Sequence, residues 1–186
     1  MAEAQTGSVE AFEALYRAHQ SGIYTFIRSQ VREAELAADL TQQTFVRAWE
    51  ALPRLRALGA FRGWLHRIAA NLVRDEVKSG RARLEVTVTS LAGDDDEAEI
   101  EFPAADTAET VVVANELRDQ VRAALAHLPA EQRAAVVMHH LEGLSVTEIA
   151  HALGVRPGTV MSRLARAREA LRRRLARYVE VEDDLL

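Results

Sequence analysis

The sequence contains no cysteine at any of its 186 positions. This absence excludes disulfide bonds and metal sites built on thiolates. Long apolar runs are also missing, because no stretch approaches the roughly 20 apolar residues that a membrane-spanning helix needs. The first residues lack the charged segment followed by an apolar one that is typical of a secretory signal. We therefore expect a cytoplasmic protein that does not insert into a membrane.

Signatures of catalysis are missing as well. The sequence has no glycine-rich loop that could cradle a phosphate, no nucleophile elbow and no recognisable pair of carboxylates. His139, His140 and His151 could suggest a helical enzyme or a metal sensor. However, nothing sets three ligands at a fixed spacing beside an acidic support. We therefore predict a protein that is not an enzyme and that holds neither a metal nor a cofactor.

Aromatic residues are scarce, with five Phe, three Tyr and two Trp. Phe61 and Trp64 fit a helix core better than a platform on which bases stack.

The charge is unevenly distributed along the chain. The net charge is −5, yet residues 1–83 carry 12 basic and 9 acidic side chains. Residues 84–110 carry no basic and 9 acidic side chains, and residues 111–186 carry 11 basic and 10 acidic ones. The acidity is thus concentrated in one segment between two mildly basic parts. Because binding responds to local potential, the overall charge does not exclude a nucleic-acid partner.

The pattern of apolar residues is helical in both basic parts, and it predicts an all-α fold of two small helical domains. The predicted boundaries are a first domain at 1–83, a flexible acidic linker at 84–107, a second domain at 108–178 and an acidic tail at 179–186. In the first domain we expect one helix starting at Ser8, one over 33–52 ended by Pro53, and one from about residue 60. The apolar positions expected to face inward from the second of these helices are Leu36, Leu40, Phe45, Val46 and Trp49.

The stretch 144–164 predicts a helix-turn-helix at the end of the second domain. Ser145 and Glu148 stand at the spacing of a capping box, which satisfies free amides at a helix start. Gly154 stands where a left-handed residue would end this first helix, and Pro157 suits the first turn of the next one. The expected buried positions on the second helix are Val160, Leu164, Ala167, Leu171 and Leu175.

The second helix of this pair is rich in arginine. Eight arginines and one acid, Glu169, lie between Arg156 and Tyr178. This charge favours a recognition helix that carries its own phosphate contacts. An ordinary helical hairpin with a solvated basic face remains the alternative.

Four motifs, in this order and spacing, resemble a bacterial RNA polymerase sigma factor of the extracytoplasmic-function (ECF) group. They are DLTQQTFVRAW at 39–49, FRGWLHRIAAN at 61–71, LPAEQR at 128–133 and GTVMSRLARAR at 158–168. The resemblance covers roughly residues 8–178. It implies a dissociable specificity subunit, whose first domain binds the clamp helices of the largest polymerase subunit and engages the −10 element. The second domain would read the −35 element as duplex DNA near the polymerase flap region.

The resemblance also implies roles for the linker and for a further partner. The acidic linker would thread toward the active-site cleft and the RNA exit path, whose walls are expected to be basic. An anti-sigma factor that covers both domains commonly holds such proteins inactive.

The resemblance assigns site residues on three surfaces. The expected polymerase-binding residues are Asp39, Gln42, Gln43 and Arg47, of which 39, 43 and 47 share one side of a helix. Gln43 stands where the family often has an acid. For the −10 element the expected residues are Arg56, Arg62, Arg67, Asn71, Arg74, Asp75 and Lys78. The Asn71 amide offers both a donor and an acceptor to a flipped base, whereas Arg56, Arg62 and Lys78 suit phosphates.

For the −35 element the expected residues are Arg156, Thr159, Ser162, Arg163 and Arg166. Met161 stands where the family often has a basic residue, which leaves an apolar contact suited to a thymine methyl. A stand-alone helix-turn-helix regulator, which binds operators as a dimer, would explain this half of the chain. It would leave the motifs at 39–49 and 61–71 unused.

Overall fold

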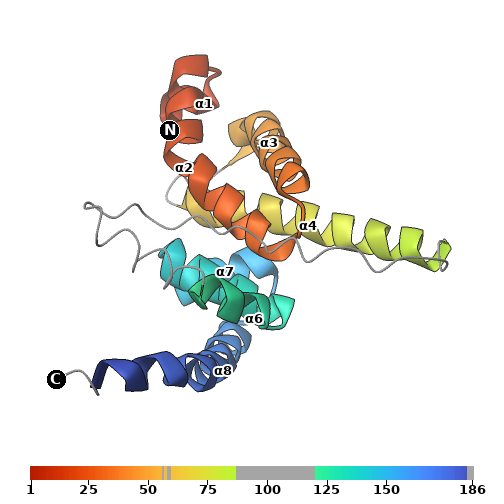
Figure 1. Cartoon of the computed structure of the whole chain (residues 1–186). Coiled ribbons are helices and arrows are strands. Elements are labelled where there is room, and N and C mark those ends of the chain that lie inside the picture. Colours follow the sequence, from red (N-terminus) through yellow and green to blue (C-terminus); the bar gives the residue numbers. More distant parts are fainter. Residues whose placement is uncertain (56, 58–59, 87–119, 184–186) are drawn as a thin grey trace, which may run out of the picture.

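The computed structural model describes residues 1–55, 57, 60–86 and 120–183, with the backbone alone for 80–86 and 177–183. Every regular element in these ranges is helical, so the predicted all-α class is confirmed for them (Figure 1). In chain order the elements are α1 (Ala2–Gln5), α2 (Val9–Gln30), α3 (Ala34–Ala51), η1 (Leu52–Arg54), α4 (Phe61–Val86), α6 (Ala130–Val136), η3 (Val137–Leu141), α7 (Val146–Leu153) and α8 (Pro157–Asp183). A further helical stretch occupies residues 120–126.

The predicted linker and tail differ in part from the helices that the structure describes. Helix α4 continues to Val86, so the first three residues of the predicted linker 84–107 are helical. The remainder of that linker lies outside the described residues. Helix α8 continues to Asp183, so residues 179–183 of the predicted tail 179–186 belong to this helix.

Local sequence signals set the ends of the first helices. The Ser8 hydroxyl accepts a hydrogen bond from the amide of Ala11 at 3.2 Å, which caps the start of α2 as its position predicts. Pro53 lies in η1, the short helical turn that ends α3. Val46 differs from the prediction, because its side chain is 58% exposed instead of facing inward. It lies one position from buried Phe45, and on a helix that step turns the side chain out of the apolar stripe.

The helix-turn-helix has the predicted geometry. Ser145 and Glu148 form a complete capping box at the start of α7. Gly154 has φ +68°, the left-handed conformation that a side chain disfavours, and it ends α7 before Pro157 begins α8. The residues that pack this pair together are buried Ile149, Ala150, Val160, Leu164 and Ala167, with Leu171 and Leu175 half-buried.

The capping box gives a first prediction. Ser145→Ala removes the acceptor for the Glu148 amide, so we expect a loss of about 1 kcal/mol in the free energy of unfolding. For a chain of this size that loss corresponds to a fall of roughly 2–4 °C in Tm. Ser162→Ala, an exposed substitution within α8, is the matched control and should leave Tm nearly unchanged. Equal losses in both variants would contradict the capping role.

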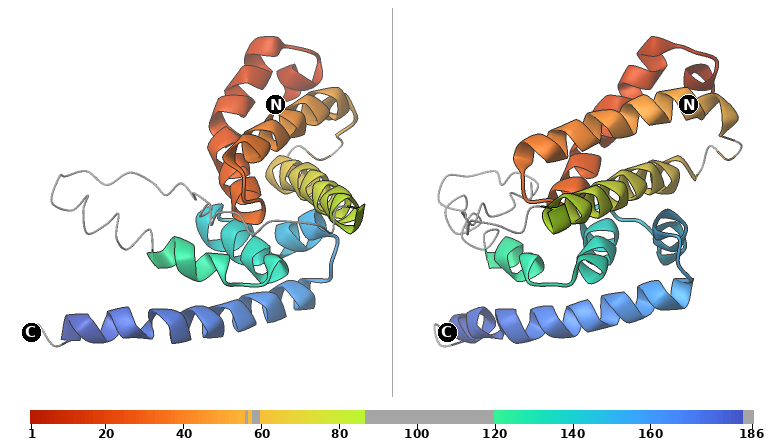
Figure 2. Two further views of the ribbon diagram at one scale, coloured as in Figure 1. Left: turned by 45° about the vertical axis from the view of Figure 1, so that its right-hand side comes forward. Right: turned by 90° about the vertical axis from the view of Figure 1, so that its right-hand side faces the viewer.

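The two helical groups, α1–α4 and the helices from residue 120 onward, pack against each other. Among the described elements α4 and α7 form the most extensive pairing, and α2 also contacts α6 and η3 (Figures 1 and 2). Buried residues from both groups belong to one continuous apolar cluster. Its largest fully buried members include Ile23, Phe26, Leu65, Met138, Ile149 and Val160. No helix of the described ranges is both long and apolar enough to cross a membrane.

Candidate nucleic-acid and polymerase interfaces

One face of α3 carries the polar residues that the sequence singled out. Asp39, Gln43 and Arg47 are all exposed, and their spacing of four residues sets them along one side of the helix. Gln42 is exposed beside them. Helices α2 and α4 contact α3 through its buried residues. The polar face lies outside these contacts. The arrangement offers a solvated polar strip to a partner.

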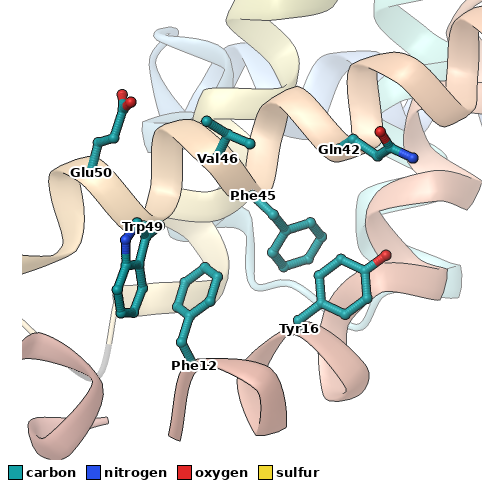
Figure 3. A pocket seen from close by; sticks show the side chains of 7 residues that line it. All are labelled: Phe12, Tyr16, Gln42, Phe45, Val46, Trp49 and Glu50. Atoms are coloured by element: carbon teal, nitrogen blue, oxygen red, sulfur yellow. The ribbon is translucent and has the colours of Figure 1, made fainter. Parts of the chain in front are cut away.

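An open apolar pocket of about 420 Å³ adjoins this strip between α2 and α3 (Figure 3). Phe12 and Tyr16 rise from α2 and meet Phe45 and Trp49 from α3. The ring centroids of Phe12 and Trp49 are 4.9 Å apart, and those of Tyr16 and Phe45 are 4.7 Å apart, both edge-on. The remaining residues that line the pocket are Gln42, Val46 and Glu50. Polar and apolar contact surface therefore meet on α3.

The candidate −10 residues lie along α4. The residues that are exposed along this helix include Arg62, Arg67, Asn71, Arg74, Asp75 and Lys78. The Arg74 guanidinium donates to Oδ1 of Asn71 at 2.8 Å, which orients the amide that the sequence analysis assigned to a base. Arg56 lies outside the described residues.

Three of these arginines contact α7 or the turn before it, which the sequence did not predict. The Arg62 guanidinium donates to the backbone carbonyl of Glu142. Arg67 donates to Nε2 of His151 at 3.2 Å, and Arg74 reaches the carbonyl of Leu153 at 3.5 Å. The candidate −10 face therefore lies against α7 and the turn before it. The two residues of each contact are about 80 positions apart in the chain, so no local sequence pattern predicts these contacts.

A buried histidine supports this side of α4. His66 is 3% exposed, and its Nδ1 lies 2.9 Å from the carbonyl of Arg62. Burial lowers the pKa of His66 to about 4, and the nearby positive charge of Arg62 acts in the same direction. The imidazole is therefore neutral near pH 7, with Nδ1–H donating to the carbonyl. Its Nε2 is buried and has no hydrogen-bond partner within the described ranges.

Two carboxylates of the second group lie beside the same surface. Burial raises the pKa of Glu142, although the charge of Arg62 opposes this shift. Hydrogen bonds from the Ser145 hydroxyl and backbone lower the pKa of Glu148. The Glu142 carboxylate lies against Gly22 on α2, so a Cβ at this position would require the flexible Glu142 side chain to move.

The candidate −35 residues differ in accessibility at the start of α8. Arg156, Ser162 and Arg166 are exposed, and Thr159 is half-buried. Arg163 differs, because its side chain is 15% exposed and its guanidinium lies 2.5 Å from the carboxylate of Glu131. The sequence analysis missed this pairing, although Glu131 belongs to the LPAEQR motif.

The outward face of this helix start is only partly basic. Met161 is 62% exposed, and Ser162, Ala165 and Arg166 are exposed with it. Two turns of α8 thus offer one thioether, one hydroxyl, one methyl and one guanidinium to a groove. Such a surface reads base edges through few hydrogen bonds and several apolar contacts.

The histidines do not gather into a ligand set. Nδ1 of His139 lies 2.9 Å from the carbonyl of Leu144, and the rings of His139 and His140 stack edge-on with centroids 4.8 Å apart. His151 lies against Arg67 instead. In the part of the chain that the structure describes, no group of three or more His, Asp or Glu side chains could hold a metal ion.

Comparison with known proteins adds evidence from outside the chain. The family model for sigma-70 region 2 matches residues 15–83, and the model for sigma-70 region 4 matches residues 118–171. The chain is 38% identical over 172 residues to the ECF RNA polymerase sigma factor SigE of Mycolicibacterium smegmatis, covering 92% of this chain and 64% of that protein. It is 34% identical over 173 residues to the RNA polymerase sigma-H factor of Pseudomonas aeruginosa, covering 90% and 87%.

Two solved structures share the arrangement of helices. CnrH, solved in complex with the cytosolic domain of CnrY, aligns with a TM-score of 0.64 at 26% identity, covering 94% of each chain. RpoE of Bartonella quintana, solved with the anti-sigma factor NepR, aligns with a TM-score of 0.70 at 23% identity, covering 90% of this chain and 98% of that one. At 23% identity the second likeness concerns the fold alone.

Proposed function

This chain belongs to the ECF family of RNA polymerase sigma factors, and we propose that it binds core RNA polymerase and directs it to promoters through their −10 and −35 elements. The resemblance inferred from the four sequence motifs is confirmed. The observation that carries the function is the sigma-H match, since one alignment spans both sigma regions and 87% of a curated sigma factor. The family is not enzymatic, so polymerase supplies the catalysis.

The domain roles follow from the same premise. We propose a region 2-like domain at 1–83 for polymerase and the −10 element, and a region 4-like domain at 108–178 for the −35 element near the flap. The acidic segment 84–107 connects them through the polymerase cleft, and 179–186 is a terminal extension. The family-model matches at 15–83 and 118–171 each fall within one of these two domains, which supports the division.

On α3 we assign Asp39, Gln42, Gln43 and Arg47 to the clamp helices of the largest polymerase subunit. Their exposure on one helix side supports the assignment. The exposed Val46 side chain adds an apolar contact within the same strip. Gln43 offers a neutral hydrogen bond where the family often has an acid, so Asp39 supplies the negative charge of this surface.

On α4 we assign Asn71 to a base of the −10 element and the neighbouring cations to its phosphates. The phosphate-binding set is Arg56, Arg62, Arg67, Arg74 and Lys78, with Asp75 close to the same strand. The bond from Arg74 to Asn71 supports this division, because it occupies Oδ1 and leaves the amide NH2 of Asn71 to donate to a base.

On α8 we assign Ser162 and Arg166 to base edges, and Arg156 and Thr159 to the phosphate backbone. Arg163, also predicted as a base reader, is better suited to a positioning role, because its guanidinium is engaged by Glu131 on α6. Met161 extends the reading face with an apolar contact, so we expect a thymine opposite it in the −35 element.

The different roles of Arg163 and Arg166 give a second prediction. Arg166→Ala should weaken binding of the holoenzyme to a −35 duplex about tenfold and leave Tm unchanged, because this side chain is exposed. Arg163→Ala should lower the free energy of unfolding by up to about 1 kcal/mol, because it removes the ion pair between the half-buried guanidinium and the exposed carboxylate of Glu131. Glu131→Gln should reproduce the Arg163 effect, and the double variant should add little to it. Additive losses of unfolding free energy in the double variant would contradict the pairing with Glu131, and Arg163 would then be assigned to contact with DNA.

Run-off transcription tests the proposed function directly. Core polymerase is incubated with a library of genomic fragments, with and without this protein. We expect new discrete start sites that share −35 and −10 elements upstream. No added transcripts, together with tight binding of the free protein to duplex DNA in a gel shift, would instead favour the stand-alone regulator.

The remaining partners come from the relatives. CnrH and the Bartonella RpoE are each solved with a second protein, CnrY or the anti-sigma factor NepR. We propose that this chain likewise has an anti-sigma partner and acts in the cytoplasm, where polymerase is found. Co-purification of the tagged chain from its own cells would identify the partner, and recovery of core polymerase alone would argue against one.

A further inference from the structure

The helical segment formed by α3 and η1 ends without a glycine cap. The last carbonyls of a helix have no partner inside it, and a glycine in the left-handed conformation commonly completes such an end. Here the residue after η1 is Leu55, whose backbone is extended at φ −71° and ψ 110°. Its amide donates to the carbonyl of Leu52 at 3.0 Å. Further donors to the carbonyls of this turn must come from another part of the chain or from water.

The side chain of Gln5, on helix α1, supplies such donors. Its Nε2 donates to the carbonyl of Leu55 at 2.6 Å and to the carbonyl of Leu52 at 3.1 Å. An amide NH2 group carries two hydrogens, so this one group can serve both carbonyls. The bonded residues are 47 and 50 positions apart, so the end of η1 is completed by a distant side chain.

Helix α1 is itself held in place, which makes Gln5 a fixed support. Ala4, the residue before Gln5, is 2% exposed and belongs to the continuous apolar cluster. The Thr6 hydroxyl and the Ser8 amide donate to the carbonyl of Glu3 at 2.8 and 3.0 Å, in the turn that leads into α2. Figure 1 shows α1 folded back beside the start of α2, and α1 contacts both α2 and η1.

The connection that Gln5 holds leads into the helix assigned to the −10 element. Arg54 is exposed between the two held carbonyls, and Arg56, a proposed phosphate contact outside the described residues, follows Leu55 in the sequence. Because a carbonyl and the following amide share one plane, holding the Leu55 carbonyl orients the peptide through which the chain continues. At the other end of the connection Phe61 begins α4 and is 4% exposed. The connection is thus fixed at both ends.

We propose that Gln5 is a positioning residue for recognition of the −10 element, because it holds the backbone that connects η1 to α4. The inference rests on the proposed function, since it assumes that this connection and α4 meet the −10 element. It goes beyond the family match, because α1 precedes the residues 15–83 that the region 2 model covers. Loss of the Gln5 amide should weaken −10 recognition and spare the binding of polymerase and of the −35 element, whose proposed surfaces lie on α3 and α8.

Three substitutions separate hydrogen bonding from packing. Gln5→Met removes both donors and keeps a side chain of similar length. Gln5→Lys restores N–H donors, because an ammonium group carries three hydrogens. Gln20→Met makes the same chemical change at an exposed position of α2 and is the matched control. Gln5 is half-buried, so all three variants should fold, and their Tm values check this.

Discrimination at the −10 element is the decisive readout. A promoter recovered by run-off transcription supplies a probe that is duplex across the −35 element and single-stranded across the −10 element. A second probe has the same bases of the −10 element in scrambled order. The ratio of the holoenzyme's affinities for the two probes measures −10 recognition.

We expect Gln5→Met to lower this ratio at least threefold, whereas Gln5→Lys and Gln20→Met should keep most of it. The affinities for core polymerase and for a −35 duplex should change less than twofold in every variant. A loss that only destabilised the fold would affect all three affinities and would not be rescued by lysine. A smaller loss in Gln5→Met, an equal loss in Gln5→Lys, or a parallel fall in the other two affinities would overturn the proposal.

Hydrogen exchange of the free protein gives an independent measurement that needs no promoter. The amide of Leu55 donates within the held turn, so it should exchange at least fivefold faster in Gln5→Met, while the amides of α3 exchange as in wild type. Unchanged exchange at Leu55 would overturn the positioning role. Faster exchange in a protein whose wild type gives no run-off transcripts would instead refute the proposed function, so the two failures are distinguishable.

Discussion

Replacing Asp39 and Gln43 together by arginine is expected to lower the affinity of the protein for core RNA polymerase at least 100-fold. The change adds two units of positive charge at Asp39 and one at Gln43, four residues apart on the same exposed side of α3. A partner surface that is complementary to Asp39 carries positive charge, and juxtaposing like charges across an interface costs several kcal/mol. A 100-fold loss corresponds to about 2.7 kcal/mol, which is within that range.

The measurement is fluorescence anisotropy of the labelled protein titrated with core polymerase, followed by run-off transcription. The matched control is Glu13→Arg with Gln20→Arg, which makes the same charge change on exposed positions of α2. The control breaks the ion pair between Glu13 and Arg17, which is exposed and contributes little to stability. An equal loss in the control, or less than a threefold loss in the α3 variant, would remove α3 from the polymerase interface.

The parts of the fold that the sequence predicted are those set by neighbouring residues. A hydroxyl before a helical run caps it, as Ser8 and Ser145 do, and a glycine at the end of α7 adopts the left-handed conformation. The exposed strip on α3 follows in the same way from a spacing of four residues. Each of these signals acts within one turn of helix, so the sequence carries it explicitly.

The parts that the sequence did not predict depend on contacts between distant segments. The pairing of Arg163 with Glu131 joins residues 32 positions apart and makes a predicted reading residue a support of the helix. The docking of α7 on α4 depends on the shapes of two helix faces, and Gly63 marks it only by the absence of a side chain. A periodic apolar pattern shows that a helix has a partner without showing which one.

His66 combines both kinds of information, and it yields the second large effect. Its place in the motif at 61–71 was visible in the sequence, but its burial was not, because histidine occurs on helix surfaces and in cores alike. The structure puts it in contact with Phe26, with ring centroids 5.8 Å apart. A side chain with a titratable nitrogen is thus enclosed where protonation is unfavourable.

Acidification is therefore expected to destabilise the protein between pH 6.5 and pH 4 by about 3 kcal/mol through His66 alone. The pKa of a histidine outside the fold is 6.5, and burial lowers that of His66 to about 4. Between these values the unfolded chain binds the proton more readily than the folded chain, so the free energy of unfolding falls as the pH falls. Each pH unit in this window is worth about 1.4 kcal/mol for one proton. Burial also lowers the pKa of His19, which adds to the slope in the same direction.

The variant His66→Gln isolates this contribution. Glutamine has no titration in this range, and its amide can still donate toward the carbonyl of Arg62. Urea unfolding at pH 7, 6 and 5 gives the slope of stability against pH for each protein, and slopes remain comparable when the variant shifts stability at every pH. We expect the His66→Gln slope between pH 6 and 5 to be about 1 kcal/mol per unit shallower than that of wild type. The exposed His127→Gln is the control and should keep the wild-type slope. An unchanged slope in His66→Gln would mean that His66 is not buried. It would also contradict the close packing on this side of α4.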